Sequence, residues 1–149
     1  STATDLAPYL TDATRLESQL GLPGFYARRR LGVGRFFSRA DIEKTRDHQV
    51  TQVLALAGAS YRCGGAGCGP VLFRYGRECR MTLLIDGYPA PQQDIGTMDL
   101  DDVVGIEVYR RGYQPAAGET LENGYDLAAL ARVCGLVVIW TRAATPRTD

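Results

Sequence analysis

The four cysteines, Cys63, Cys68, Cys79 and Cys134, are the residues of this chain with the clearest chemistry. Four cysteines allow three disulfide pairings, which the sequence leaves open. We favour Cys63 with Cys68, across a Gly-rich loop, and Cys79 with Cys134, because each of the latter precedes a segment with strand character. Closing these loops would contribute about 2 and about 4 kcal/mol. Disulfides persist in oxidising compartments, so we expect a periplasmic or extracellular protein.

Two other cysteine chemistries are weaker alternatives. A four-thiolate zinc site normally uses two closely spaced Cys pairs, and the gap from Cys79 to Cys134 is far too long for one. A redox role for Cys63 and Cys68 lacks the CxxC spacing of disulfide oxidoreductases. A disulfide framework therefore remains the preferred interpretation.

Other residues with chemical potential are isolated. His48 is the sole histidine and has no Ser or Cys at a spacing that suits a catalytic triad. The segment 32–34, Gly-Val-Gly, lacks the third glycine and the Lys-Ser/Thr of a phosphate-binding loop. Asp99, Asp101 and Asp102 lack calcium-loop spacing, and helix capping explains them. We therefore expect a non-enzymatic protein without catalytic residues, cofactor or metal.

Basic clusters and loop tyrosines are the candidate partner-binding residues. The arginines could bind an acidic protein face or lipid headgroups, in peripheral contact with a membrane, although a solvated sheet edge is the preferred explanation. Tyrosine is enriched at the energetic centres of interfaces, although scattered surface aromatics are also common. The candidate set is Tyr9, Arg28, Arg29, Arg30, Tyr88, Arg110, Arg111 and Tyr113.

Length and composition limit the class of protein. The chain has 149 residues, of which 45% are hydrophobic, which suits one compact domain. Its 17 basic residues equal its 17 acidic residues, so nucleic acid is not an expected partner. No apolar run reaches the length of a transmembrane helix. The chain starts at Ser1, which suits removal of an export signal or a trimmed N-terminus.

The N-terminal half predicts short helices. Ser38 with Asp41 has the spacing of a capping box, which predicts a helix that ends near Arg46. Apolar residues at positions 50, 53, 54 and 57 share one helical face, and Gly58 can end that helix. Residues 1–33 are interpreted as a leader that docks elsewhere, with a short helix near Phe25.

The C-terminal half predicts strands. Buried strands are expected at 81–85 and 136–141, and a half-exposed strand at 106–109, where polar and apolar residues alternate. The segment 59–62 suggests an edge strand. The Gly-rich segment 63–76 is expected to be a surface loop. These elements predict an α+β fold with a small mixed sheet and short helices.

The order of three segments resembles the plug domain of TonB-dependent outer-membrane receptors. The segments are a strand that ends in Ile85-Asp86-Gly87, an acidic strand over 101–110, and a closing strand over 134–142 that starts with Cys-Gly and ends with Thr-Arg. The helices at 36–45, which contain Arg-Ala-Asp-Ile-Glu, and at 50–58 are similar to the family's opening helices. The resemblance spans about Gly34 to Arg142.

This chain also departs from the plug pattern. The family's Gly-Pro after the acidic strand is replaced by Arg110-Arg111-Gly112-Tyr113, and the first 12 residues show no energy-coupling motif. Family plugs lie inside a barrel of about 22 strands. Because the sequence stops at Asp149, soon after the closing strand, we expect that this chain alone does not transport.

The resemblance divides the chain and implies two functions. We expect a leader at 1–33, a receptor-plug-like domain at 34–142 and a tail at 143–149. The first hypothesis is a non-enzymatic accessory or scaffold subunit that binds protein subunits of a larger cell-envelope complex on the periplasmic side of a membrane. The alternative is a plug, or a stand-alone ligand-capturing component, of a TonB-dependent transport system.

Overall fold

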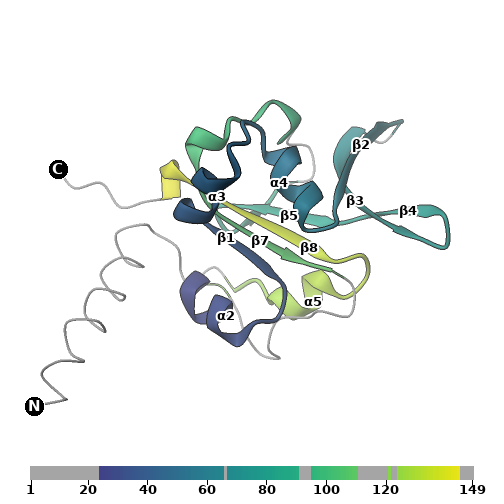
Figure 1. Ribbon diagram of the computed structural model, residues 1–149. Coiled ribbons are helices and arrows are strands. Elements are labelled where there is room, and N and C mark those ends of the chain that lie inside the picture. Colours follow the sequence, from purple (N-terminus) through teal and green to yellow (C-terminus); the bar gives the residue numbers. More distant parts are fainter. Residues whose placement is uncertain (1–23, 66, 91–94, 111–120, 122–123, 145–149) are drawn as a thin grey trace, which may run out of the picture.

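The structure is a computed structural model that describes residues 24–65, 67–90, 95–110, 121 and 124–144 (Figure 1). A five-stranded mixed sheet forms the body of the protein, and a three-stranded sheet extends from one end of it. The expected α+β class with a small mixed sheet and short helices is confirmed.

The central sheet has the strand order β1-β7-β8-β5-β6. Strand β8 pairs with β5 in parallel and with β7 antiparallel, and the two outer pairs are antiparallel. The strands near Met81, Ile106 and Leu136 therefore share one sheet, as the sequence pattern predicts. Their bounds are β1 Arg35–Ser38, β5 Thr82–Ile85, β6 Tyr88–Pro89, β7 Val103–Tyr109 and β8 Leu136–Thr141.

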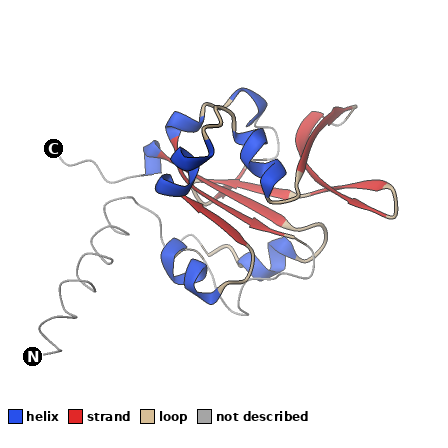
Figure 2. Cartoon of the chain, in the orientation of Figure 1, coloured by secondary structure: helices blue, strands red, loops and turns tan. Residues whose placement is uncertain are grey.

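Helices cover both faces of the central sheet (Figure 2). Helices α3 and α4 pack on one face and α2 and α5 on the other, and each pair encloses its own cluster of buried side chains. The bounds are α2 Phe25–Leu31, α3 Arg39–Thr45, α4 Val50–Leu56, α5 Leu127–Ala131 and the 3-10 turns η1 Ile95–Thr97, η2 Leu100–Asp102 and η3 Arg142–Ala144.

Two sequence-based expectations about burial are corrected by this layering. Every residue of β7 is buried, so the strand predicted to be half-exposed at 106–109 is a central one, because α2 and α5 cover its second face. Phe25 and Arg28 of α2 are also buried. Helix α2 therefore belongs to the folded body, although it lies within the expected leader at 1–33.

The predicted helix starts and stops are confirmed. The Ser38 hydroxyl accepts a hydrogen bond from the Asp41 backbone N–H, and the Asp41 carboxylate accepts one from the Ser38 backbone N–H. This capping box satisfies two donors that would otherwise lack partners at the start of α3. Gly58, with φ of 84°, follows α4 in the left-handed conformation that glycine adopts without strain.

The Gly-rich segment expected to be a surface loop forms strands instead. An antiparallel sheet in the order β2-β3-β4 extends from the body, and we call its three strands the arm. Val71 and Leu72 of β3 are buried where the arm meets the body. The strands are β2 Ser60–Gly64, β3 Gly67–Arg74 and β4 Arg77–Arg80.

Candidate functional site: a basic, disulfide-anchored arm

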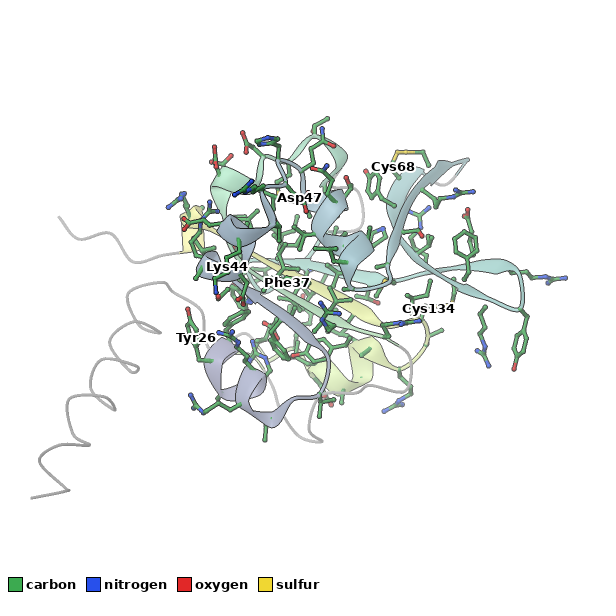
Figure 3. The ribbon with its side chains drawn as sticks, viewed as in Figure 1. Tyr26, Phe37, Lys44, Asp47, Cys68 and Cys134 are labelled. Atoms are coloured by element: carbon green, nitrogen blue, oxygen red, sulfur yellow. A yellow bond between two sulfur atoms is a disulfide. The ribbon has the colours of Figure 1, made fainter. Side chains whose placement is uncertain are left out.

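Two disulfides hold the arm, and they are the pairings favoured from the sequence. Cys63 and Cys68 face each other across the β2–β3 pair with their Cα atoms 3.9 Å apart. Cys79 of β4 is bonded to Cys134, just before β8, with a Cα separation of 5.5 Å. All four cysteines are therefore paired (Figure 3). The second bond joins the arm covalently to the central sheet.

Beyond the Cys79–Cys134 disulfide, the end of the β3–β4 hairpin projects from the body. Leu72, which pairs in register with Cys79, is buried. The next residue, Phe73, is 53% exposed, and Tyr75 at the turn is 90% exposed. Figure 3 shows side chains that point away from the body at this end of the hairpin. The exposed end of the hairpin is therefore short, and it lies close to the Cys79–Cys134 disulfide that holds it to the body.

The arm is more basic than the rest of the chain. It contains Arg62, Arg74, Arg77 and Arg80 but only one acidic residue, Glu78, whereas the whole chain has 17 residues of each sign. Segregated charge of one sign produces a local potential that attracts an oppositely charged surface and orients its approach. The arm therefore suits an acidic partner.

Two of these arginines lie over the exposed aromatic rings. The guanidinium carbon of Arg62 is 5.5 Å from the centroid of the Phe73 ring, and that of Arg74 is 5.4 Å from the Tyr75 ring. Arg62 Nε also donates to Glu78 Oε1 at 3.1 Å, which ties β2 to β4 across β3. Tyr and Arg are over-represented among residues that dominate binding energy. Cation–π contact orders these side chains before a partner arrives.

The turn that presents Tyr75 is conformationally unusual. Tyr75 and Gly76 connect β3 to β4, and both have positive φ, 52° and 74°. Two-residue turns with positive φ at both positions favour Asn-Gly or Gly-Gly, because a side chain with a Cβ is disfavoured there. A large aromatic residue in this conformation costs stability, and such costs concentrate at functional sites.

A second polar cluster lies in the interior. Arg28 donates from Nε and Nη2 to the two carboxylate oxygens of Glu107, both at 2.7 Å. Tyr109 Oη donates to Oε1 at 2.5 Å and Trp140 Nε1 to Oε2 at 2.7 Å. Burial, followed by the adjacent Glu107 charge, raises the pKa of Tyr109 far above its ordinary value. This saturated, enclosed cluster fixes α2 to β7 and β8 and offers no open position for a substrate.

The predicted partner-binding residues do not form one surface. The prediction that Arg28 binds a partner is wrong, because Arg28 is buried and forms an ion pair with Glu107 in the interior of the protein. Arg29 pairs with Asp41 at 3.2 Å. Arg30 and Arg110 are exposed near the β1 edge of the sheet, whereas Tyr88, 61% exposed, lies at the opposite β6 edge. Tyr9, Arg111 and Tyr113 lie outside the described residues.

The edge strand expected at 59–62 is confirmed as β2, but β3 and β4 were missed in the sequence, because glycine and proline interrupt the pattern of β3 and β4 is mostly charged. The sequence contained one local signal for the hairpin. The dipeptide Tyr75-Gly76 stands between the apolar residues 71–73 and the charged segment 77–80. Tyr75-Gly76 shares only the glycine with the Asn-Gly and Gly-Gly dipeptides that signal a two-residue hairpin turn, so the signal is weak.

The remaining candidates have structural roles. Asp99 caps η2, because its Oδ1 accepts from the Asp101 backbone N–H at 2.9 Å. His48 is exposed next to the start of α4. Across the described part of the chain, His, Cys, Asp and Glu side chains form no group of three or more that could hold a metal ion.

Comparisons with known proteins leave the family of this chain open. No protein-family model matches it, and no curated protein matches it. The described residues contain no helix long and apolar enough to cross a membrane.

Proposed function

We propose that this protein is a non-enzymatic docking module that serves as an accessory or scaffold subunit of a larger cell-envelope complex. In this proposal the arm binds an acidic surface of a partner subunit. The observation that carries it is the exposed, arginine-flanked Tyr75, presented on a hairpin that Cys79–Cys134 bonds to the body.

Several features of the arm suit a protein partner. An aromatic ring with ordered arginines supplies contact area, charge and hydrogen-bond donors while little side-chain entropy remains to be lost. The disulfide limits the motion of the hairpin relative to the body, which reduces the ordering cost of binding. Two disulfides also suit an oxidising compartment, which agrees with a location on the periplasmic side of a membrane.

The proposal is tested by native electrophoresis of mild-detergent extracts from the membranes that contain the protein. We expect the wild-type chain to migrate within an assembly much larger than its 16.2 kDa. A variant that combines Arg74→Glu, Tyr75→Ala and Arg77→Glu should migrate as a monomer. Lys44→Glu, an exposed change on α3, is the matched control and should leave the assembly intact.

Circular dichroism of each purified variant checks that it is folded. A wild-type chain that migrates only as a monomer would contradict the docking module. An assembly that survives the triple variant would contradict the arm as the docking surface.

A second candidate function is the plug of a TonB-dependent transport system, or a stand-alone ligand-capturing form of it. One contact favours it: Asp86 of the Ile-Asp-Gly segment accepts from the Thr141 backbone N–H at 2.7 Å and from its hydroxyl at 2.6 Å. This contact joins two of the segments that carry the resemblance. The test is saturable binding of ferric siderophores to the purified chain; the absence of such binding favours the docking module.

A further inference from the structure

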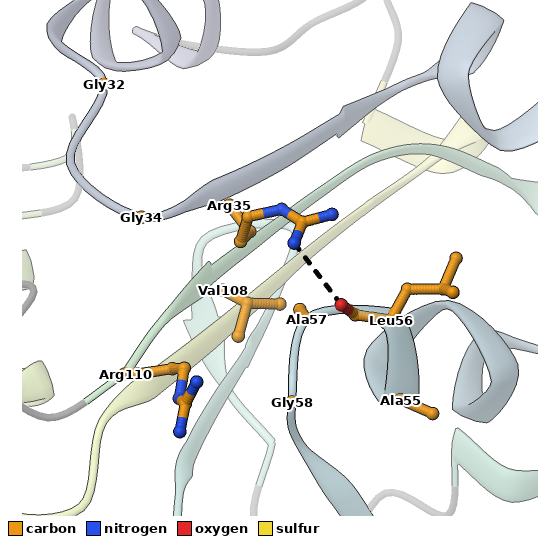
Figure 4. Close-up of a pocket in the computed structure, with 9 residues that line it drawn as sticks. All are labelled: Gly32, Gly34, Arg35, Ala55, Leu56, Ala57, Gly58, Val108 and Arg110. Atoms are coloured by element: carbon orange, nitrogen blue, oxygen red, sulfur yellow. Dashed lines mark hydrogen bonds between the residues drawn. The ribbon is translucent and has the colours of Figure 1, made fainter.

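A pocket of about 390 Å³ lies between the end of α4 and the neighbouring ends of β1 and β7 (Figure 4). This volume falls within the range of small-molecule sites. The pocket is on the α3/α4 side of the central sheet and does not involve the arm. Its lining residues are Gly32, Gly34, Arg35, Ala55, Leu56, Ala57, Gly58, Val108 and Arg110.

Strand pairing places two arginines at this pocket. Arg35 of β1 pairs in register with Val108 of β7, so their side chains lie on the same face of the sheet. Arg110 follows Val108 by two residues, which returns its side chain to that face. Figure 4 shows both guanidinium groups beside the end of α4.

These two positive charges are not neutralised by any described carboxylate. Arg35 donates one long hydrogen bond, 3.4 Å, to the Leu56 carbonyl and lies 5.3 Å from the centroid of the Phe37 ring. Arg110 makes no hydrogen bond or ion pair with a described residue, and the pocket lining contains no Asp or Glu. Two like charges on neighbouring strands repel each other. An anion bound between them would remove that repulsion.

Two glycines allow close contacts at the pocket, and one of them lies against Arg110. A Cβ on Gly58 would lie 3.1 Å from Nη1 of Arg110, so the absence of a side chain allows the guanidinium to lie against the backbone. A Cβ on Gly34 would lie 2.9 Å from both the Tyr109 ring and the Val108 carbonyl oxygen. Because neither residue has a side chain, the Gly58 backbone can lie against Arg110, and the Gly34 backbone can lie against Val108 and Tyr109.

The other side chains that line the pocket are apolar. Val108 and Ala57 are buried at the base, and the Leu56 side chain is 52% exposed at the rim. An occupant that places charge at the guanidinium groups would therefore place its remaining atoms against hydrocarbon. A small ion without an apolar part would make no contact with the Leu56 and Val108 side chains.

We propose that this pocket binds a small organic carboxylate, held by Arg35 and Arg110, with its apolar body against Leu56 and Val108. Guanidinium groups bind carboxylate and phosphate oxygens through paired hydrogen bonds. The C-terminal end of α4 at the pocket carries partial negative charge, which disfavours a phosphate dianion more strongly than a monoanion. The site is independent of the arm and goes beyond the docking function.

The proposal is tested by NMR titration of the ¹⁵N-labelled protein at constant ionic strength. The probes are sodium acetate, sodium hexanoate, hexan-1-ol and sodium phosphate. We expect saturable shifts of the Gly32, Gly34 and Gly58 amide signals with hexanoate, weaker binding of acetate, and no saturable shift with hexanol or phosphate. Arg35→Gln and Arg110→Gln should each weaken hexanoate binding by about tenfold or more, because each removes one charged donor.

Arg132→Gln removes an exposed arginine on the opposite side of the sheet and should leave hexanoate binding unchanged. The dispersion of each variant's spectrum shows whether it remains folded. Unsaturable shifts, equal binding of phosphate and hexanoate, or full binding by both folded Arg→Gln variants would each overturn the proposal. These outcomes leave the docking proposal untouched, because that test uses the arm.

Discussion

Arg28 and Glu107 form a two-point ion pair in the interior of the protein, although 79 residues separate them in the sequence. Both nitrogen–oxygen distances are 2.7 Å. Tyr109 and Trp140 donate to the same carboxylate, so each of its oxygens accepts two hydrogen bonds. One buried anion therefore connects α2, β7 and β8.

Replacing only the cation of this pair should be strongly destabilising. Arg28→Met leaves the Glu107 carboxylate buried without its countercharge, which typically costs about 3–5 kcal/mol in the free energy of unfolding. Adding Glu107→Gln removes the charge; the amide oxygen can still accept from Trp140 Nε1, and the amide NH2 can donate to the Tyr109 hydroxyl in place of the original bond. We therefore expect the double variant to be more stable than Arg28→Met alone, measured by urea unfolding.

The control is Arg29→Met, which removes a neighbouring arginine whose pair with Asp41 is partly exposed. Exposed pairs contribute about 1 kcal/mol or less. If Arg28→Met lowers the free energy of unfolding no more than Arg29→Met does, the interior ion pair does not hold α2 to the sheet. If the double variant is less stable than Arg28→Met, the loss comes from packing and not from the unpaired charge.

The two disulfides should differ in their effect on stability. In the chain-entropy model, the Cys79–Cys134 bond, which spans 55 residues, contributes about 4 kcal/mol, and the Cys63–Cys68 bond, which spans 5, contributes about 2 kcal/mol. Paired Cys→Ala variants of each bond, compared by chemical denaturation, check this order. Non-reducing peptide mapping of the wild-type protein checks the pairing. A larger loss on removal of Cys63–Cys68 would contradict this entropic order.

Local signals in the sequence predicted local structure well. The capping box at Ser38 and Asp41, the face of α4 and the closing strand at 136–141 all depend on residues within a few positions of each other. The disulfide pairing was also predicted, because each distant cysteine precedes a strand. Short-range spacing was sufficient for the capping box, α4 and the closing strand, whereas the Cys79–Cys134 pairing, which spans 55 residues, followed from the two strands expected after these cysteines.

Other features that depend on distant partners were not predicted. Glu107 among apolar residues suggests a half-exposed strand unless Arg28 is known to lie beside it. Strands β3 and β4 of the arm were missed for another reason: β3 contains glycines and a proline, and the two strands are held by the disulfides and by Leu72 packed against the body. The pocket arginines become neighbours only through the β1–β7 register.

We expect Tyr75 to make the protein less stable than a residue that tolerates its backbone conformation. Its φ of 52° is left-handed, and Asn tolerates this conformation better than an aromatic residue does. We expect Tyr75→Asn to raise the free energy of unfolding by about 0.5–1 kcal/mol, measured by urea denaturation. The same substitution should weaken docking in the native-gel assay. A Tyr75→Asn variant that is less stable would show that Tyr75 supports the hairpin through Arg74, and would weaken the case for a docking role.

Asp41 should make the stability of the protein depend on pH in the acidic range. Burial alone would raise the pKa of Asp41, but the Ser38 N–H and hydroxyl, each 3.0 Å from Oδ2, and the nearby charge of Arg29 outweigh it. The pKa of Asp41 therefore lies below its ordinary value of 3.8. A lowered pKa in the folded state means that the ionised carboxylate stabilises the fold above the ordinary pKa. That contribution is lost as the pH falls through the folded-state value.

We expect Asp41→Asn to lower the free energy of unfolding by about 1 kcal/mol near neutral pH, the usual effect of weakening a helix cap. The difference from wild type should shrink below pH 3.8 and disappear at lower pH, because the wild-type carboxyl is then also neutral. Urea unfolding at several pH values measures it. Glu43→Gln, which removes an exposed carboxylate from the same helix, is the control and should give a smaller difference. A difference between Asp41→Asn and wild type that stays constant across this range would mean that the cap depends on the shape of the side chain and not on its charge.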